Sequence, residues 1–167
     1  GLDIEGDGDK DLVVSILSFN SMNLLVNSGD ATTANIGSQD ITFPANFDNT
    51  DAIDVYTFPA AFLADVNNDG QDDIIASPYQ ENNGHNYQSS HLYTNTSSTA
   101  DFNLEFTKNN FLQDEMIELG TSAYPVFFDY DQDGLKDLLV GGRGYFVSSG
   151  VYSSQLAYYR NTGTATG

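Results

Sequence analysis

An acidic loop motif occurs three times in the sequence, and this repetition most constrains how the chain can fold. The segments DIEGDGDKDLVVS, DVNNDGQDDIIAS and DYDQDGLKDLLVG begin at Asp3, Asp65 and Asp129, so their starts lie 62 and 64 residues apart. Each copy has acidic or amide residues at its first, third, fifth and ninth positions, a glycine at the sixth, and an apolar segment after the ninth. Such a period is typical of repeat proteins, in which each repeat is one supersecondary unit.

The chemistry of the motif points to a hard cation. Calcium takes 6–8 oxygen ligands, and alternating acidic residues before a glycine turn can surround one ion. An EF-hand would also need a glutamate at position 12 and a helix on each side. In the third copy position 12 is Val140, and the flanking segments YPVFF and LLVGG predict strands, so an EF-hand is excluded. An acidic surface turn could explain one copy, whereas three copies in one register favour cation binding.

A second marker recurs between the loops. Each of the segments LLVNSG, LYTNTS and YYRNTG has an asparagine at the expected end of a strand, namely Asn27, Asn95 and Asn161. The middle repeat then contains four expected strands, at 61–65, 72–77, 90–96 and 104–110. Four short antiparallel strands per repeat are typical of a β-propeller blade.

The predicted fold class is therefore all-β, a partial β-propeller of four-stranded antiparallel blades with calcium loops between the first and second strands. We expect blade one at 1–58 with its first strand truncated, blade two at 59–122, and blade three at 123–167 without its fourth strand. Propellers usually have ~4–8 blades, and we therefore expect all three blades to be part of one larger propeller.

These motifs resemble the FG-GAP or VCBS repeat of integrin alpha-subunit propellers and of many secreted bacterial proteins. The resemblance implies a calcium ion in each loop, held by the side chains at positions 1, 3, 5 and 9 and by the main-chain carbonyl at position 7. The implied ligands are Asp3, Glu5, Asp7, Asp9 (carbonyl) and Asp11; Asp65, Asn67, Asp69, Gln71 (carbonyl) and Asp73; and Asp129, Asp131, Asp133, Leu135 (carbonyl) and Asp137.

The three implied sites differ in their residues. The third has four aspartates and both flanking strands, and we expect it to be the best formed. The first site contains Glu5, whose side chain is one methylene longer than that of aspartate, and only two residues precede the loop. We therefore expect the first site to be the weakest.

Composition supports structural calcium and excludes a nucleic-acid partner. The chain has a formal net charge of −19 and lacks the basic residues that nucleic-acid phosphates require. Clustered carboxylates repel each other without a cation, so stability should depend on bound metal. There is no cysteine for a disulfide or for thiol chemistry, and no apolar run approaches the ~20 residues of a membrane-spanning helix.

Localisation follows from the calcium hypothesis and from resemblance. Weak sites with Kd ~10⁻⁴–10⁻³ M are typical of extracellular calcium-binding modules. The chain also resembles exported proteins of Gram-negative bacteria, many of which use type IX secretion. We therefore expect a secreted or cell-surface protein, from a Gram-negative bacterium.

No catalytic constellation stands out in the sequence. His85 and His91 lack zinc-type spacing, and His91 is better explained as a strand-edge residue. Glu115 and Glu118 could form a carboxylate pair of the glycosidase kind, but a solvated connection between blades explains them better. Arg143 beside glycines is a weak candidate for anion binding. The sequon at Asn95 coincides with the recurring strand-end asparagine, which favours a structural role.

The variable inserts at 77–90 and 142–155 are the candidate recognition surface, because loops on a rigid scaffold often carry function. They should lie on the face opposite the calcium loops. Aromatic residues there suit protein or sugar contact, although packing on neighbouring loops is the alternative. The candidate ligand-binding residues are Tyr79, His85, Tyr87, Tyr145, Phe146 and Tyr152.

The sequence thus predicts a non-catalytic, calcium-binding extracellular recognition or adhesion module. Its expected partners are a protein or glycan ligand, and further blades of the same parent protein or a partner chain. The main alternative is a propeller belonging to a polysaccharide-active enzyme or lectin whose catalytic residues lie elsewhere. A metal-dependent active site within this segment is a third, weaker alternative.

Overall fold

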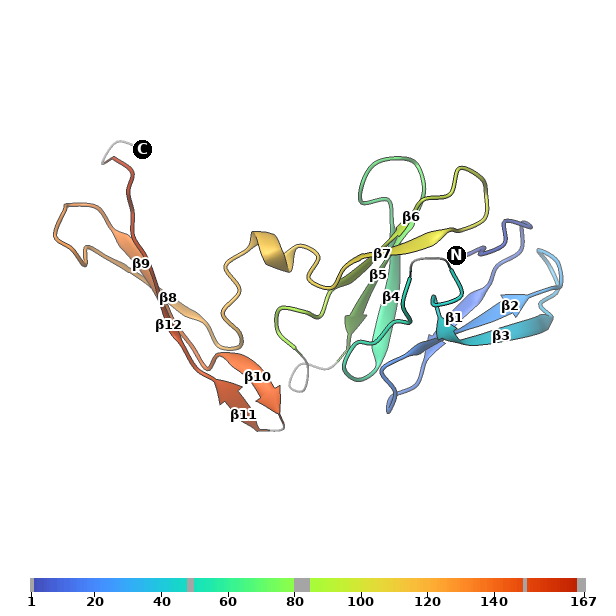
Figure 1. Ribbon diagram of the computed structural model, residues 1–167, viewed down its shortest axis with the longest axis horizontal. Coiled ribbons are helices and arrows are strands. Elements are labelled where there is room, and N and C mark those ends of the chain that lie inside the picture. The colour runs from blue at the N-terminus through green and yellow to red at the C-terminus, as the bar shows by residue number, and fades with distance from the viewer. Residues whose placement is uncertain (1, 48–49, 80–84, 149, 165–167) are drawn as a thin grey trace.

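The computed structural model describes residues 2–47, 50–79, 85–148 and 150–164, and these residues form an all-β structure of antiparallel sheets (Figure 1). Within these ranges the only helical element is the short 3₁₀ turn η1 (Gln113–Glu115). The predicted all-β class is confirmed, and none of the sheets closes on itself. The described part of the chain contains no helix that is long and apolar enough to cross a membrane.

The second sheet is the most complete of the three main sheets. Its strands are β4 (Pro59–Ala64), β5 (Asp73–Pro78), β6 (His91–Asn95) and β7 (Leu104–Lys108), which are hydrogen-bonded in sequence order. Each strand pairs antiparallel with the next. Four antiparallel strands in the middle repeat agree with the expectation from the sequence.

The first sheet has three strands, β1 (Leu12–Ser15), β2 (Met22–Asn27) and β3 (Ile36–Phe43), in the order β1-β2-β3. The first acidic loop precedes β1. The sheet therefore corresponds to the second, third and fourth strands of the complete second sheet.

The third sheet also has three strands, β8 (Tyr124–Phe128), β9 (Asp137–Gly141) and β12 (Leu156–Tyr159), in the order β8-β9-β12. Between β9 and β12 the chain forms a separate hairpin of β10 (Tyr145–Ser148) and β11 (Val151–Ser153). The sequence predicts an insert here but not a hairpin. Branched and aromatic residues occur in both strands, and Gly150, which precedes β11, has a φ of 76° that suits a turn; together these features explain the extra strand pair.

The first two sheets share one hydrophobic core. From the first repeat, Leu24 and Phe43 are buried in it, and from the second repeat Ile74, Tyr93 and Leu104 are buried against them. Apolar side chains excluded from water on facing sheet surfaces are the main stabilising contribution to such packing.

The first acidic loop also contacts the second repeat. The Phe102 N–H donates a hydrogen bond to the Ile4 carbonyl at 2.9 Å. Gly6 lies so close to this segment that an added Cβ would be 2.6 Å from the Asp101 nitrogen. Only glycine fits at this position, where φ is 70°. The loop is therefore fixed between the two repeats.

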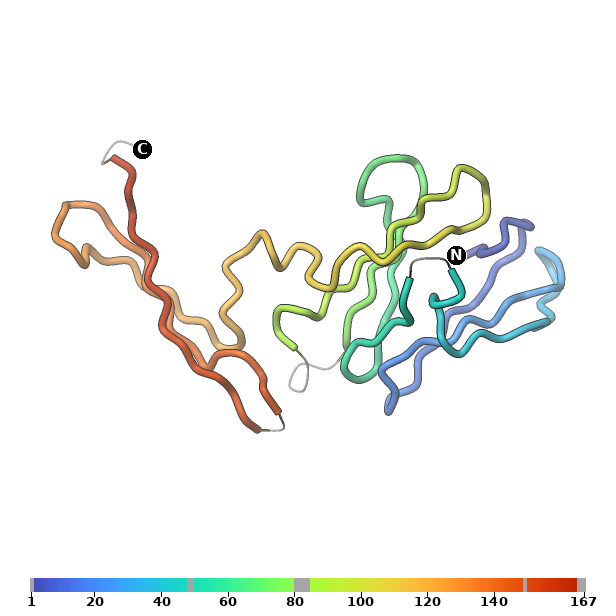
Figure 2. Tube along the Cα trace, viewed as in Figure 1, coloured from blue at the N-terminus to red at the C-terminus, as the bar shows by residue number. Residues whose placement is uncertain are grey.

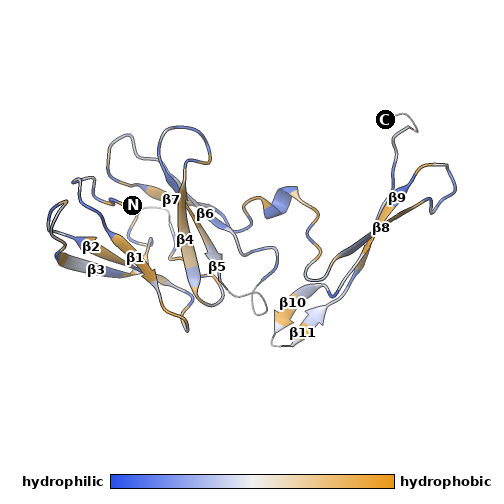
Figure 3. Ribbon diagram, turned by 180° about the vertical axis from the view of Figure 1, so that it is seen from behind, coloured by the Kyte–Doolittle hydropathy of each residue, from blue (hydrophilic) through white to orange (hydrophobic). Residues whose placement is uncertain are grey.

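The third sheet stands apart from the first two in both views of the ribbon (Figures 1 and 3). All five residues of β8 are exposed, including the apolar Val126, Phe127 and Phe128. The sequence leads us to expect 126–128 and 138–140 to pack against the next blade, and a face without a next blade to stay exposed. The structure places no sheet over β8 within the described residues, whereas in β9 Val140 is buried.

Candidate metal-binding loops

The three acidic loops occupy equivalent places in the fold. The second loop (65–73) connects β4 to β5, the third loop (129–137) connects β8 to β9, and the first loop (3–11) leads into β1. Because antiparallel strands reverse direction at each connection, the inserts that follow β5 and β9 lie at the opposite ends of the strands, as the chain trace shows (Figure 2). The loops and the inserts therefore belong to different ends of the molecule.

Each loop turns at its sixth-position glycine. Gly8, Gly70 and Gly134 have φ values of 97°, 92° and 88°, which non-glycine residues rarely adopt. The carboxylate at position 1 accepts two hydrogen bonds across this turn, from the N–H groups of positions 5 and 6. The distances are 3.1 and 3.0 Å for Asp3, 3.1 and 2.9 Å for Asp65, and 3.1 and 2.9 Å for Asp129.

The carboxylate at position 5 stabilises the second half of the turn in the same way in every loop. It accepts a hydrogen bond from the N–H of position 7, at 3.0 Å for Asp7, 2.8 Å for Asp69 and 2.9 Å for Asp133. Such side-chain-to-backbone bonds are typical of Asx turns. The spacing of the acidic residues therefore gives one reproducible loop conformation.

The ninth-position aspartates Asp11, Asp73 and Asp137 are buried and tie each loop to the third strand of its repeat. In every repeat one carboxylate oxygen accepts the N–H of loop position 2, and the other accepts the N–H of the strand-end asparagine. The pairs are Asp11 with Ile4 (2.6 Å) and Asn27 (2.8 Å), Asp73 with Val66 (3.0 Å) and Asn95 (2.8 Å), and Asp137 with Tyr130 (3.0 Å) and Asn161 (2.8 Å). We call these three residues the bridging aspartates.

The strand-end asparagines continue this network into the next turn. The side-chain oxygen of Asn27 accepts the N–H of Gly29 and of Asn35, and the buried Asn95 accepts the N–H of Ser97 and of Asn103. Asn161 makes the first of these bonds, to Gly163 at 3.0 Å. These roles are structural and explain why asparagine recurs there.

The third loop brings three carboxylates together. Asp129, Asp131 and Asp137 each have an oxygen within 4.8 Å of the others. Hydrogen bonds donated by the Asn161 N–H, the Tyr130 N–H and the Tyr158 hydroxyl lower the pKa of Asp137, the first of these having the largest effect. Burial, followed by the nearby Asp137 carboxylate, raises the pKa of Tyr158 to about 12.

Arg160 also lies at the third loop, directly before the strand-end asparagine. Its Nε lies 2.6 Å from Asp131 Oδ2, and its Nη2 lies 3.3 Å from Asp133 Oδ2. These two carboxylates raise the pKa of Arg160 above its ordinary value. The sequence motifs do not predict a role for this residue, although its position next to the recurring asparagine marks it as a neighbour of the loop.

The first loop differs through Asp9, at position 7. This side chain is only 3% exposed, and neither carboxylate oxygen has a hydrogen-bond partner. Burial, followed by the charges of Asp7 and Asp11, raises the pKa of Asp9. Burial and the Asp11 charge likewise raise the pKa of the exposed Glu5. The first loop thus concentrates negative charge that no described side chain neutralises, apart from Lys10 at 3.8 Å from Asp3.

The second loop has the simplest composition. Asn67 replaces a carboxylate at position 3, and its side chain donates to Asp69 Oδ2 at 2.8 Å while accepting the Asp69 N–H at 2.9 Å. Gln71 stands at position 7, where only its main-chain carbonyl is expected to bind a cation. This loop carries one carboxylate fewer at the four side-chain positions than the other two.

The candidate recognition residues lie at the opposite end, and several of them contact one another. Tyr87 packs edge-on against Tyr145 with ring centroids 5.4 Å apart, and Phe146 contacts Tyr152 at 5.9 Å. The Arg143 guanidinium lies 3.8 Å from the centre of the Tyr152 ring. The Tyr87–Tyr145 contact joins the β10–β11 hairpin to the insert of the second repeat, whereas the other two contacts lie within the insert of the third repeat. All three agree with the packing alternative.

Tyr79 and His85 are different. Both are exposed, and Tyr79 has 74% of its surface accessible although it packs edge-on against Phe58. Of the candidate recognition residues, these two and the exposed Tyr87 are therefore the most available to a partner.

The weaker catalytic candidates have structural contacts. The Glu118 carboxylate accepts a hydrogen bond from the Gly120 N–H, and the Glu118 main-chain carbonyl accepts one from the Tyr145 hydroxyl. His91 begins β6, packs against Phe106 with ring centroids 5.9 Å apart, and has its pKa lowered by burial. These positions are consistent with the structural interpretation.

A comparison with known protein families gives a match in the middle of the chain. Residues 65–140 match the family model described as FG-GAP-like repeat. The match begins at the first residue of the second loop and includes the whole third loop. No match was found among curated proteins or among solved structures.

Proposed function

We propose that this chain is a non-catalytic, calcium-binding recognition or adhesion module of a secreted or cell-surface protein, built from FG-GAP-like repeats. One observation carries the proposal. The same loop conformation, with aspartates at positions 1, 5 and 9, recurs three times, and the family match covers two of the three loops.

The donor groups fit calcium. The loops offer carboxylate, amide and carbonyl oxygens and no sulfur or imidazole, as a hard cation prefers. Asp129, Asp131 and Asp137 already lie near one another, and the buried Asp9 carboxylate has no partner among the described residues. The side chains at positions 1, 3, 5 and 9 and the carbonyl at position 7 would hold the ion in each loop.

Bound calcium would supply positive charge where the loops concentrate negative charge. The bridging aspartates would transmit this stabilisation, because each connects its loop to a strand-end asparagine across the sheet. We therefore propose that calcium is structural and stabilises the folded repeat. Extracellular calcium fills sites with Kd ~10⁻⁴–10⁻³ M, which supports the proposed secreted or cell-surface location. We propose export from a Gram-negative bacterium by type IX secretion.

We further propose that the three sheets are blades of a larger β-propeller. The first two sheets pack face to face, and the third presents exposed apolar side chains on β8. Further blades of the same parent protein, or a partner chain, would cover that face. Repeat architectures bury a continuous core in this way only when neighbouring repeats stack.

The recognition surface would be the end opposite the calcium loops, with Tyr79, His85 and Tyr87 as its accessible side chains. Aromatic rings there suit a protein or a glycan ligand. A propeller of a polysaccharide-active enzyme or lectin, with its catalytic residues elsewhere, would use the same surface to hold its substrate.

Metal analysis after dialysis against calcium tests the proposal. The full chain should retain three calcium ions, and Asp69→Ala should retain two. Asp72→Ala is the matched control, since Asp72 lies in the same loop, is exposed, and is outside the proposed ligand positions. A wild-type chain that retains no calcium would contradict the proposed function.

Binding of the full chain to a panel of neutral and acidic polysaccharides tests the recognition surface. Tyr79→Ser should weaken any binding observed and leave the calcium content at three ions. Equal weakening by Asp72→Ser, at the opposite end of β5, would contradict this assignment.

A further inference from the structure

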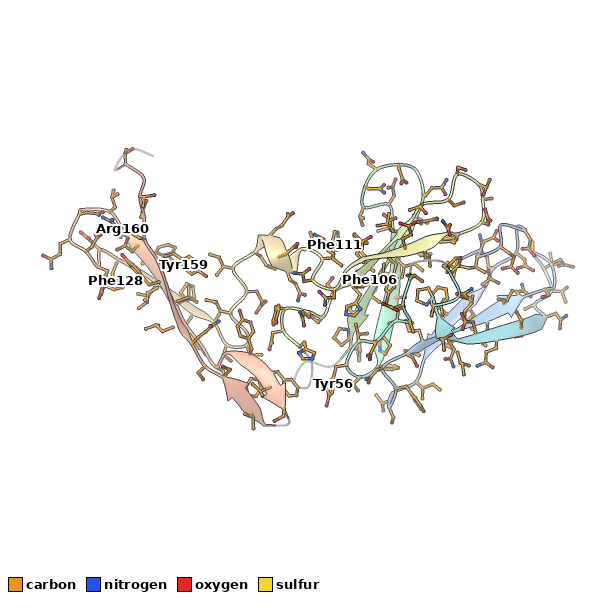
Figure 4. The ribbon with its side chains drawn as sticks, in the orientation of Figure 1. Tyr56, Phe106, Phe111, Phe128, Tyr159 and Arg160 are labelled. Atoms are coloured by element: carbon orange, nitrogen blue, oxygen red, sulfur yellow. The ribbon has the colours of Figure 1, made fainter. Side chains whose placement is uncertain are left out.

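Arg160 gives the third loop a cation of its own. It follows the last residue of β12 and lies beside the loop between β8 and β9 (Figure 4). The guanidinium spans two carboxylates, with its Nε 2.6 Å from Asp131 and its Nη2 3.3 Å from Asp133. Its planar array of donors makes such a double contact favourable.

The two carboxylates that Arg160 contacts are those at loop positions 3 and 5. Both are proposed cation ligands, and the oxygens that face the guanidinium would have to face a divalent ion instead. Asp131 is also one of the three carboxylates whose oxygens lie within 4.8 Å of one another. The arginine therefore occupies part of the coordination that the ion requires.

Within the described part of the chain, the other two loops have no equivalent cation. The residues that directly precede their strand-end asparagines are Val26 and Thr94. In the first loop Lys10 lies 3.8 Å from Asp3, with a highly exposed side chain, which gives a weak interaction. Asp9 adds a buried carboxylate without a hydrogen-bond partner to the first loop. The net charge of the first loop is therefore further from neutral than that of the third loop.

From these contacts we infer that Arg160 is an internal counterion of the third loop. It lowers the affinity of this loop for a divalent cation below the affinity of the first loop, and its side chain leaves the loop when the ion binds. This inference rests on the calcium binding proposed above and concerns its regulation. It reverses the order expected from the sequence, in which the third site is the best formed. The side chain of Arg160 is 56% exposed, so its release into water is sterically open.

The effect should be moderate. Partly exposed ion pairs each contribute about 0.2–1 kcal/mol, so removing both should raise the calcium affinity of the third loop roughly two- to thirtyfold. Arg160→Lys keeps the charge but loses the planar double contact, and it should give a smaller increase.

Calcium titration by isothermal calorimetry tests this in the full chain carrying Asp7→Ala and Asp69→Ala, which leave the third loop as the intact site. Arg160→Gln should then bind calcium about two- to thirtyfold more tightly. Lys136→Gln is the matched control, because it removes the same charge from position 8 of the same loop and Lys136 forms none of the ion pairs of the described residues. It should change the affinity less than twofold.

A second measurement keeps the inference testable if a variant fails to fold. In the wild-type chain the NMR signal of the Arg160 Nε–H should shift during calcium titration, with a midpoint at higher calcium than signals of the first loop. Equal affinity of Arg160→Gln and its parent, or an unmoved Arg160 signal while the third loop fills, would overturn the inference and leave the proposed function intact. Absence of calcium binding at every loop would overturn both.

Discussion

The first two sheets and the third sheet use the same acidic loop, yet only the first two share a core. Tyr93 and Tyr159 both stand two residues before a strand-end asparagine. Tyr93 is 1% exposed in the core between the first two sheets, whereas Tyr159 is 39% exposed on the third sheet. The bridging aspartates of the second and third sheets, Asp73 and Asp137, are in contrast equally buried. Each accepts the N–H of loop position 2 and the N–H of the strand-end asparagine in its own repeat.

The comparison separates two levels of organisation. The loop, the bridging aspartate and the strand-end asparagine form a local unit that is complete within one repeat. The packing of one sheet on another is non-local and depends on a neighbour. A repeat can therefore have its candidate calcium loop fully formed while its apolar face is uncovered.

The largest expected effect distinguishes the two regions directly. Tyr93→Ala should lower the free energy of unfolding by about 3–5 kcal/mol, because it leaves a cavity in the shared core. Tyr159→Ala, at the equivalent position of the third sheet, should cost less than about 1 kcal/mol. Urea unfolding of both variants measures the difference, and similar losses would show that the third sheet is covered in solution.

Substitution of the bridging aspartates should destabilise both regions, unlike substitution of the two tyrosines. Asp73→Asn places an amide nitrogen against a backbone N–H and should cost about 1–3 kcal/mol. Asp137→Asn should destabilise the third sheet through the same lost contacts. Hydrogen exchange at Asn95 and Asn161, whose N–H groups these carboxylates accept, should accelerate in the respective variant. Acceleration at Asn95 alone would show that the two bridges are not equivalent.

Calcium removal should destabilise both the packed and the exposed repeats, because the proposed sites are local. At calcium ten times above Kd, each occupied loop should contribute about 1.4 kcal/mol to folding. Excess chelator should therefore lower the melting temperature, and Asp133→Ala should reproduce part of the loss while the other two loops keep their ions. An unchanged melt in chelator would mean that the loops are metal-independent turns.

The smallest expected effect concerns the contact between the second repeat and the hairpin of the third. The Tyr87–Tyr145 pair should have a coupling energy of about 0.5–1.5 kcal/mol in a double-mutant cycle with alanine. A coupling near zero would indicate that these rings are free for a ligand, as the sequence-based hypothesis of a recognition surface requires.

The sequence predicts the local unit well because its elements are short-range. Glycine turns, alternating aspartates and β-branched strands specify loop conformation and strand position within a few residues, and the strands of the second sheet appear where the pattern places them. It also marks Asn95 as structural, since the same residue type recurs at each strand end.

Other features depend on contacts between distant residues, which periodicity does not encode. The pairing of Arg160 with Asp131 requires β12 to end beside the loop that precedes β9. The bridging role of Asp73 depends on β6 lying next to β5, because its partner Asn95 is 22 residues away. Likewise, the Tyr87–Tyr145 contact depends on a hairpin that the sequence does not predict.

The most direct test of the calcium proposal is anomalous diffraction from crystals of the full chain grown in saturating calcium. The account predicts one anomalous peak inside each acidic loop, about 2.3–2.6 Å from the oxygens at positions 1, 3, 5 and 9, with Arg160 turned away from Asp131 at the third. Well-ordered second and third loops without anomalous peaks, and with Arg160 still bound to Asp131, would contradict it.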